Sequence, residues 1–336
     1  MTKNENKLRL VFFATPEFAL PCLEQVRECA NFEITAVVTA SDKPSGRGLK
    51  LTPSPVKVFA EKHNIPCFQP PSLKSLTLSE DKHFSSTQEH LQDFCALLNQ
   101  QPPDFFVVVA YGKIIPDALI NYRQYRVVNV HPSLLPRWRG AAPIQYALFS
   151  GDQETGVSIM ALDSGIDTGP VFAQEKLPIG HDDTLASLHD KLSELSSTLL
   201  VKTLHDIQAA NLLPDEQPQE GVTYANKWDK PDCIINWLED TETISRRVRT
   251  CYPSPGAKAS FRAQEVKILK IAMKKDRNYP RGSAGEVVEA NREELIIAAG
   301  KDTYLAIEEM QFPGKSKLPI KEILKGYQIK IGERFS

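Results

Sequence analysis

Two short apolar segments, separated by the length of one helix, place the strongest constraint on the fold. Leu8–Ala14 and Ile34–Ala40 are typical of fully buried strands. Between them, Pro16 and Glu17 favour the start of a helix that runs to about Ala30, because proline suits the first helical turn and an acid its positive end. A strand, a helix and a strand at this spacing form a βαβ unit. The segment predicts an α/β fold with a mostly parallel, Rossmann-like sheet.

The turn after the first of these strands has no glycine. A nicotinamide-binding domain places G-x-G-x-x-G there, where the backbone must approach a pyrophosphate closely. Residues 14–18 read Ala-Thr-Pro-Glu-Phe instead. The pattern therefore argues against a dinucleotide-dependent dehydrogenase.

The pattern changes after a polar, proline-bearing stretch at 211–225, which has the composition of a linker. One helix is expected at 241–251, together with about five short strands. A small OB-like β-barrel is predicted, although a plain β-domain that only packs on the first domain would show the same pattern. We therefore predict a first domain at 1–210, a linker at 211–225 and a β-barrel domain at 226–336. The expected strands are 257–261, 266–273, 285–290, 295–299 and 304–310.

The net charge of −2 is unevenly distributed along the chain. Residues 226–336 hold 21 Lys+Arg against 16 Asp+Glu, or +5, whereas residues 1–225 hold 19 against 26, or −7. A basic second domain favours a polyanionic partner such as RNA. A chance division of surface charge explains the asymmetry equally well.

The six cysteines form no C-x-x-C pair and have no metal-binding spacing with the seven histidines. They are typical of reduced, mostly buried thiols, and no apolar run approaches the length of a membrane span. We expect a cytoplasmic protein without a bound metal and without a membrane anchor.

The strand-like run Val127–Val130 and the residue after it carry two polar groups that can do chemistry. Asn129 and His131 are two residues apart, so both point to the same side of the strand, at the edge where open α/β sheets build their sites. An amide can polarise a carbonyl, and an imidazole can move a proton near pH 7. Taken alone, Asn-x-His at a strand end is more often turn chemistry. The long irregular loop that follows, and the acidic loop 163–170, favour a functional site. Within the acidic loop, Asp163 is expected only to close the turn, as short Asp side chains commonly do.

A second candidate site is the loop Ser41–Ser54, which is rich in Gly, Pro, Lys and Arg. A basic loop on an otherwise acidic domain is suited to contact a phosphate backbone. A solvated surface loop is the alternative. Arg47 and, less firmly, Lys50 are the candidate nucleic-acid-binding residues.

Several longer motifs resemble those of the folate-dependent formyltransferases. They are N-V-H-P-S-L-L-P-R-W-R-G-A-A-P-I-Q at 129–145 and D-S-G-I-D-T-G-P at 163–170, with A-T-P-E-F at 14–18, K-P-S-G-R-G-L-K-L-T-P-S-P-V-K at 43–57, A-Y-G-K-I-I-P at 110–116 and R-V-R-T-C-Y-P-S-P-G-A at 247–257. Together they span nearly the whole chain in the right order, which is far more specific than one short pattern.

The resemblance implies transfer of a formyl group from 10-formyltetrahydrofolate to the amino group of methionine on initiator tRNA. A neutral amine needs no activated nucleophile, so we assign Asn129 to the oxyanion and His131 to proton transfer. The family pattern makes Asp167 the catalytic acid that orients His131. It also implies that Arg47 and Lys50 contact the tRNA acceptor stem. The family's folate-binding segment corresponds here to Ser133, Leu134, Leu135 and Pro136.

Two alternative functions remain open at this point. Related formyltransferases act on amino sugars or purine precursors, and the basic loop and basic second domain favour tRNA over these. A non-catalytic RNA-binding protein is the other alternative, against which the intact Asn129, His131 and Asp167 argue. We expect a monomer.

Overall fold

The computed structural model describes residues 7–45, 50–274 and 279–336. The chain forms two compact units. The first contains the residues up to Gly140 together with 155–177 and 189–224, and the second contains 141–154, 178–188 and 225–336. No helix in the described part of the chain combines the length and apolar character needed to cross a membrane.

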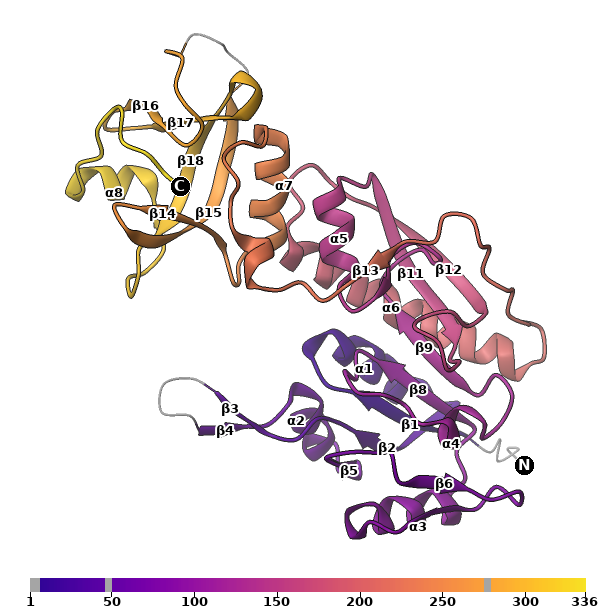
Figure 1. The fold of residues 1–336 in the computed structure, drawn as a ribbon. Coiled ribbons are helices and arrows are strands. Elements are labelled where there is room, and N and C mark those ends of the chain that lie inside the picture. The colour runs from indigo at the N-terminus through magenta and orange to yellow at the C-terminus, as the bar shows by residue number, and fades with distance from the viewer. Residues whose placement is uncertain (1–6, 46–49, 275–278) are drawn as a thin grey trace. The chain divides into compact units, whose positions relative to one another are not determined.

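The first unit is built on a seven-stranded sheet with the order β12-β11-β9-β8-β1-β2-β5. The pairs β1–β2, β1–β8, β8–β9 and β2–β5 are parallel, whereas β11 runs antiparallel to β9 (Figure 1). The predicted mostly parallel, Rossmann-like sheet is therefore confirmed. Its strands are β1 (Leu8–Ala14), β2 (Phe32–Val38), β5 (Cys67–Phe68), β8 (Phe105–Val109), β9 (Val127–His131), β11 (Glu154–Ala161) and β12 (Val171–Pro178).

Helices and small hairpins accompany this sheet. Helix α2 begins where the side chain of Ser54 accepts a hydrogen bond from the backbone N–H of Lys57, with Pro55 in the first turn. The helices are η1 (Glu17–Ala19), α1 (Leu20–Glu28), α2 (Pro55–Lys62), η2 (Glu89–Leu91), α3 (Gln92–Gln100), α4 (Asp117–Ile120) and α6 (Leu185–Gln208), whose residues fall in both units. The short strands are β3 (Lys43–Ser45), β4 (Lys50–Thr52), β6 (Leu76–Leu78), β7 (Phe84–Ser86), β10 (Arg139–Gly140) and β13 (Tyr224–Ala225).

Alternate residues of the central strands belong to different sides of the sheet. One side forms a core that includes Phe13, Phe106 and Val127, covered by α3, by α4 and by the β6–β7 hairpin. Since Asn129 and His131 follow Val127 at two-residue steps, they lie on this same side of β9. The fold thus directs both polar groups toward the side that carries α4.

The strand order reverses between β1 and β8. From β1 the chain continues outward through β2 and β5, and it later returns to the other side of β1 through β8 and β9. Across this point the residues Ala14, Val109 and Val130 are in register. The segments that follow β1, β8 and β9 therefore leave the sheet at one common edge, which is where ligands bind in open α/β sheets.

The second unit contains an antiparallel sheet with the order β14-β15-β18-β17-β16, with β19 paired to β18. Figure 1 shows its strands together with α8 in orange and yellow. Its elements are η3 (Lys230–Cys233), α7 (Thr241–Cys251), β14 (Ala257–Phe261), β15 (Gln264–Lys274), β16 (Val287–Ala290), β17 (Leu295–Ala299), η4 (Gly300–Asp302), β18 (Thr303–Gln311), β19 (Leu318–Pro319) and α8 (Ile320–Gly326), with α5 (Pro143–Ser150) in the same unit.

The end of the chain links the two outer strands of this sheet. Phe335 forms a bridge with Phe261 at the end of β14, and Arg334 forms one with Glu286 just before β16. The Phe335 ring stacks on Phe261 with 4.4 Å between centroids and is 1% exposed. The tail therefore completes a barrel-like enclosure around the core of the unit.

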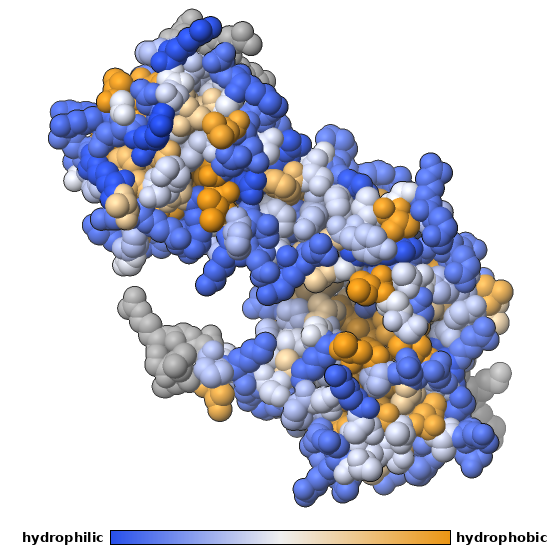
Figure 2. Space-filling model, in the orientation of Figure 1, coloured by the Kyte–Doolittle hydropathy of each residue, from blue (hydrophilic) through white to orange (hydrophobic). Residues whose placement is uncertain are grey.

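The surface of the strand-rich part of this unit is mostly polar. Figure 2 shows hydrophilic residues over most of its visible face, with hydrophobic residues in separate patches. Exposed apolar side chains such as Leu238 and Ile331 are single residues of the kind that protein surfaces normally carry.

We predict that Phe335→Ala destabilises the second unit by about 3–5 kcal/mol, because it removes a fully buried ring from the closing contact. Urea unfolding followed by the fluorescence of Trp237, whose ring lies 5.9 Å from that of Phe335, measures the loss. Ile331→Ala, at a side chain 65% exposed in the same tail, is the matched control and should change the midpoint little. Equal midpoints for the two variants would contradict the closing role.

Candidate active site

Strand β9 presents Asn129 and His131 in a nearly closed environment. All five residues of the strand are buried, and the two polar side chains are among the few buried polar groups of the sheet. Burying an amide and an imidazole is unfavourable unless they are hydrogen-bonded. Their partners therefore decide what the strand end can do.

The carboxylate of Asp167 lies beside both side chains. Nδ2 of Asn129 donates to Oδ1 of Asp167 over 3.5 Å, and Nδ1 of His131 is 3.6 Å from Oδ2. Both separations are longer than a strong hydrogen bond. The structure thus brings together the three residues that the sequence singled out, although 38 positions separate Asn129 from Asp167.

The hydrogen bond on the far side of the His131 ring determines its tautomer. Nε2 lies 2.9 Å from the backbone carbonyl oxygen of Trp138. A carbonyl oxygen only accepts, so Nε2 must carry the hydrogen. Nδ1, on the side of Asp167, is then the nitrogen that carries no hydrogen in the neutral ring.

Asp167 is held rigidly from its backbone and its side chain. Its Oδ2 accepts a hydrogen bond of 2.8 Å from the backbone N–H of Gly140. Its own φ is +51° and that of Gly140 is +121°, a region that is costly for a residue other than glycine. Strained backbone of this kind persists where surrounding contacts impose it, and it concentrates at functional sites.

The side chain of Gln217 holds the backbone of the acidic loop in place. Its Nε2 donates to the carbonyl oxygens of Asp167, at 2.8 Å, and of Gly169, at 2.7 Å. Its Oε1 accepts from Nε and Nη2 of Arg139, at 3.0 and 2.8 Å. Gln217 and Arg139 are both buried. One amide therefore joins the acidic loop to the loop that follows β9.

Sequence reasoning missed Gln217. It lies in the polar stretch 211–225, whose composition predicts a linker, and no local pattern marks it out from its neighbours. Only its location in the folded chain distinguishes it from Gln219, which is exposed. The guanidinium of Arg139, whose charge would otherwise suit an anionic ligand, is engaged with Gln217.

Asp163 makes different hydrogen bonds from Asp167. Its Oδ1 accepts from the backbone N–H of Gly165 at 3.1 Å, and both its oxygens accept from Oγ1 of Thr168. This is the usual way in which an Asp side chain closes a turn. The expected turn role of Asp163 is confirmed.

The segment Ser133, Leu134, Leu135 and Pro136 is held by hydrogen bonds within the first unit. Oγ of Ser133 donates to the carbonyl of Arg137 at 2.6 Å, and Oγ of Ser158 donates to the carbonyl of Ser133. The backbone N–H of Leu135 donates to Ser158, and Gln174 donates to the carbonyl of Leu135. Most polar atoms of the segment are thus engaged, while Leu134 and Pro136 are partly exposed.

The two predicted tRNA contacts are placed only in part. Arg47 lies outside the described residues. Lys50 begins β4, which pairs with β3 in a hairpin that Figure 1 shows extending from the first unit. Both nucleic-acid contacts therefore stay predictions.

A cavity of about 760 Å³ lies next to the acidic loop. Its lining comes from α4 and the residues after it, from Val127 at the start of β9, and from the loop at Asp163 and Ser164. Asn129, His131 and Asp167 are not among its lining residues, and Val127 lies at the opposite end of β9 from His131. The volume is within the range of about 300–1,000 Å³ that is usual for small-molecule sites. No group of three or more metal-binding side chains occurs within residues 7–45, 50–274 and 279–336.

Comparison with known proteins identifies related sequences and folds. The family model "Formyl transferase" matches residues 8–204, and "Formyl transferase, C-terminal domain" matches residues 227–328. A methionyl-tRNA formyltransferase of Aromatoleum aromaticum is 39% identical over 328 residues, covering 98% of this chain and 97% of that protein. One from Dechloromonas aromatica is also 39% identical and covers 98% and 99%.

Solved structures show the same fold at lower identity. HypX from Aquifex aeolicus in complex with tetrahydrofolic acid has a TM-score of 0.58 at 17% identity, covering 97% of this chain and 51% of that one. Methionyl-tRNA formyltransferase from Clostridium thermocellum has a TM-score of 0.51 at 16% identity, covering 80% and 94%. From the family models and the full-length relatives together, the chain belongs to the formyl transferase family.

Proposed function

We propose that this chain transfers a formyl group from 10-formyltetrahydrofolate to the α-amino group of methionine carried by initiator tRNA, for translation initiation. The convergence of Asn129, His131 and Asp167 at the end of β9 is the observation that carries the proposal. The full-length relatives named methionyl-tRNA formyltransferase support this acceptor over an amino sugar or a purine precursor.

The folate donor is assigned to the segment that follows β9. Ser133–Pro136 keep the folate-binding role that the resemblance implies, with the partly exposed Leu134 and Pro136 as the contacting side chains. Tetrahydrofolic acid is the ligand in the similar structure of HypX.

The chemistry follows from the positions of the three polar groups. Asn129 donates from Nδ2 to the formyl oxygen, where negative charge develops as the amine forms its bond to the formyl carbon. His131 exchanges a proton through Nδ1, so that the amine loses a proton and the departing folate nitrogen gains one. Asp167 orients the His131 ring from the side of Nδ1. No covalent bond to the protein is required.

The division of labour between the two parts of the chain is part of the proposal. We propose that residues 1–210 form the catalytic domain and that residues 211–225 link it to the second domain. Basic side chains within residues 226–336 contact the tRNA. Arg47 and Lys50 contact the acceptor stem. The enzyme acts as a monomer in the cytoplasm.

The acceptor is tested directly with the purified protein and 10-formyltetrahydrofolate. We expect formylation of charged initiator tRNA, and at most slow formylation of free methionine, of a phosphoribosyl amine or of a nucleotide-linked amino sugar. Mass spectrometry of the product identifies the formylated amine. A faster reaction with one of the three small amines would replace the proposed acceptor. If none of the four acceptors were formylated, a binding protein would be favoured instead.

Asn129→Ala should lower kcat by about 100- to 1,000-fold, the usual loss when one oxyanion donor is removed. His131→Ala should lower it by about 100- to 10,000-fold, because the proton route is lost. The KM values for both substrates should change little. Asn211→Ala and His181→Ala, at exposed positions, are the matched controls. Near-normal turnover in either active-site variant would refute the role given to that residue.

Gln217→Ala should lower kcat by about ten- to a hundredfold while leaving both KM values near normal, since a shift of the Asp167 loop disturbs the chemistry rather than binding. Gln217→Glu keeps an oxygen for Arg139 but loses the amide that holds the loop, so a similar loss is expected. Gln219→Ala is the exposed control two positions away. If Gln217→Glu retained full kcat, the two loop hydrogen bonds would be unimportant for the reaction.

A further inference from the structure

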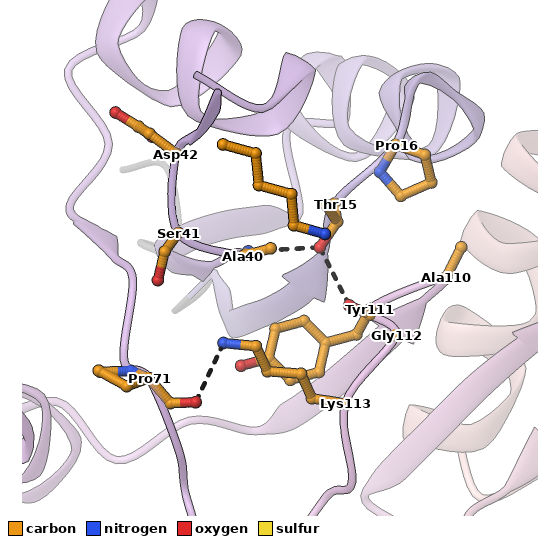
Figure 3. Close-up of a pocket in the computed structure, with 11 residues that line it drawn as sticks. Thr15, Pro16, Ala40, Ser41, Asp42, Pro71, Ala110, Tyr111, Gly112 and Lys113 are labelled. Carbon is orange, nitrogen blue, oxygen red and sulfur yellow. Dashed lines mark hydrogen bonds between the residues drawn. The ribbon is translucent and has the colours of Figure 1, made fainter. Parts of the chain in front are cut away.

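A second cavity, of about 500 Å³, opens at the point where the strand order reverses. Its lining consists of the segments that follow β1, β2 and β8 together with Pro71, and it shares no lining residue with the cavity beside the acidic loop. Figure 3 shows Thr15, Ala40 and Tyr111 at its wall. Oγ1 of Thr15 donates to the carbonyl of Tyr111 at 3.0 Å and accepts from the N–H of Ala40 at 3.3 Å, so one hydroxyl joins the three strand ends.

Lys113 brings a positive charge to this cavity. Its Nζ donates to the carbonyl oxygens of Pro70, at 2.8 Å, and of Pro71, at 3.4 Å. An ammonium group has three donors, so one is left for a ligand. Burial lowers the pKa of Lys113, and the charge of Lys43, which also lines the cavity, lowers it further. Two lysines that repel one another gain stability when an anion lies between them.

Asp42 also lines the cavity, but its charge is already balanced. Oδ2 accepts from Nζ of Lys57 at 2.8 Å, and Oδ1 accepts from Nε2 of Gln69 at 2.7 Å. The hydrogen bond from Lys57, followed by that from Gln69, lowers the pKa of this carboxyl group. With Asp42 paired to Lys57, the charges of Lys43 and Lys113 make the cavity positive.

Tyr111 adds a buried donor without a partner. The residue is 3% exposed, and its hydroxyl has no hydrogen-bond partner among the described residues. Burial raises its pKa to about 12, so the hydroxyl stays protonated at neutral pH. A buried, unpaired hydroxyl is unfavourable by itself and suits a ligand oxygen that can accept from it.

The distance between this cavity and the candidate active site follows from the strand register. Ala14, Val109 and Val130 lie in one row across β1, β8 and β9. Thr15 and His131, the next residues on β1 and β9, are therefore separated by two strand spacings, roughly 10 Å. In an aminoacyl ester of a terminal nucleotide, the ester and the ribose separate the reactive amine from the 5′-phosphate by a similar span.

We propose that this cavity binds the 5′-phosphate of the terminal nucleotide of the charged tRNA, with Lys113 as the principal cation and the Tyr111 hydroxyl as a second donor. The inference rests on the proposed function and adds to it a subsite for the acceptor end. Holding the phosphate here leaves the ester and the amine extended along the sheet edge toward Asn129 and His131.

Two short acceptors test the inference. They are methionyl-adenosine with and without a 5′-phosphate, and wild-type protein should prefer the phosphorylated form by at least about tenfold in kcat/KM. Lys113→Met should remove about tenfold of kcat/KM for the phosphorylated acceptor, mainly through KM, and leave the other acceptor unchanged. Tyr111→Phe should remove about threefold for the phosphorylated acceptor only. Lys113→Arg should keep the preference, and Lys74→Met, at an exposed position outside both cavities, should match wild type.

Binding of adenosine 5′-monophosphate, measured by calorimetry beside adenosine, gives a readout that needs no turnover. The nucleotide should bind wild type more tightly than Lys113→Met, and adenosine should bind both equally. Equal binding of the nucleotide to both proteins, or equal kinetic losses on both acceptors, would overturn the subsite. A raised KM for the formyl donor in Lys113→Met would assign the cavity to the folate instead. If charged tRNA were not formylated at all, the proposed function would fail while the nucleotide measurement still decided the phosphate site.

Discussion

The site depends on one carboxylate being fixed where two buried polar side chains can use it. Asp167 is held by the N–H of Gly140 and by the amide of Gln217, and these contacts come from three separate parts of the chain. The backbone of Asp167 is in the left-handed region, which costs roughly 1–3 kcal/mol at a residue other than glycine. The surrounding hydrogen bonds offset that cost. Without them, Asn129 and His131 would be buried polar groups beside an unconstrained loop.

The sheet explains why the segments after β1, β8 and β9 lie close together. Parallel strands end at one edge, and the reversal of strand order at β1 and β8 leaves that edge open. The cavity at the ends of β1, β2 and β8 opens at this edge, whereas the cavity beside the acidic loop is lined by Val127 at the start of β9. A transfer between two substrates requires that both reactants meet at one carbon while each keeps its own binding contacts.

Chemical roles are divided by residue environment as well as by residue type. Asp163 and Asp167 belong to the same loop, yet one closes the turn through Gly165 and Thr168 while the other faces His131. Lys57 and Lys113 are both near the second cavity, but Lys57 is paired with Asp42 and Lys113 retains a donor. The sequence alone does not show that Asp163 and Asp167, or Lys57 and Lys113, have different partners.

Much of the fold follows from local pattern. Strands β8 and β9 are apolar throughout except for the two site residues, which is typical of strands buried on both sides. Helix α7 spans the predicted residues, and the side chain of Asp240 caps its start. Asn129 and His131 were recognisable as a pair because two-residue spacing on a strand gives a common side. Asp167 was identified through the family pattern rather than through spacing, since no local rule relates it to a strand 38 positions away.

What the sequence alone determined was the set of elements, the α/β class of the first part, the strand-rich class of the second and the chemistry available at the end of β9. Those properties depend on neighbouring residues, whose spacing the sequence states directly. The tertiary structure decided which acid faces His131, that Gln217 is a buried link rather than part of a solvated connection, and that Lys113 and Tyr111 share a cavity. Each of these features depends on contacts between segments that are distant in the chain. The sequence does not state them directly, because such segments bury and hydrogen-bond one another only when the whole chain is packed.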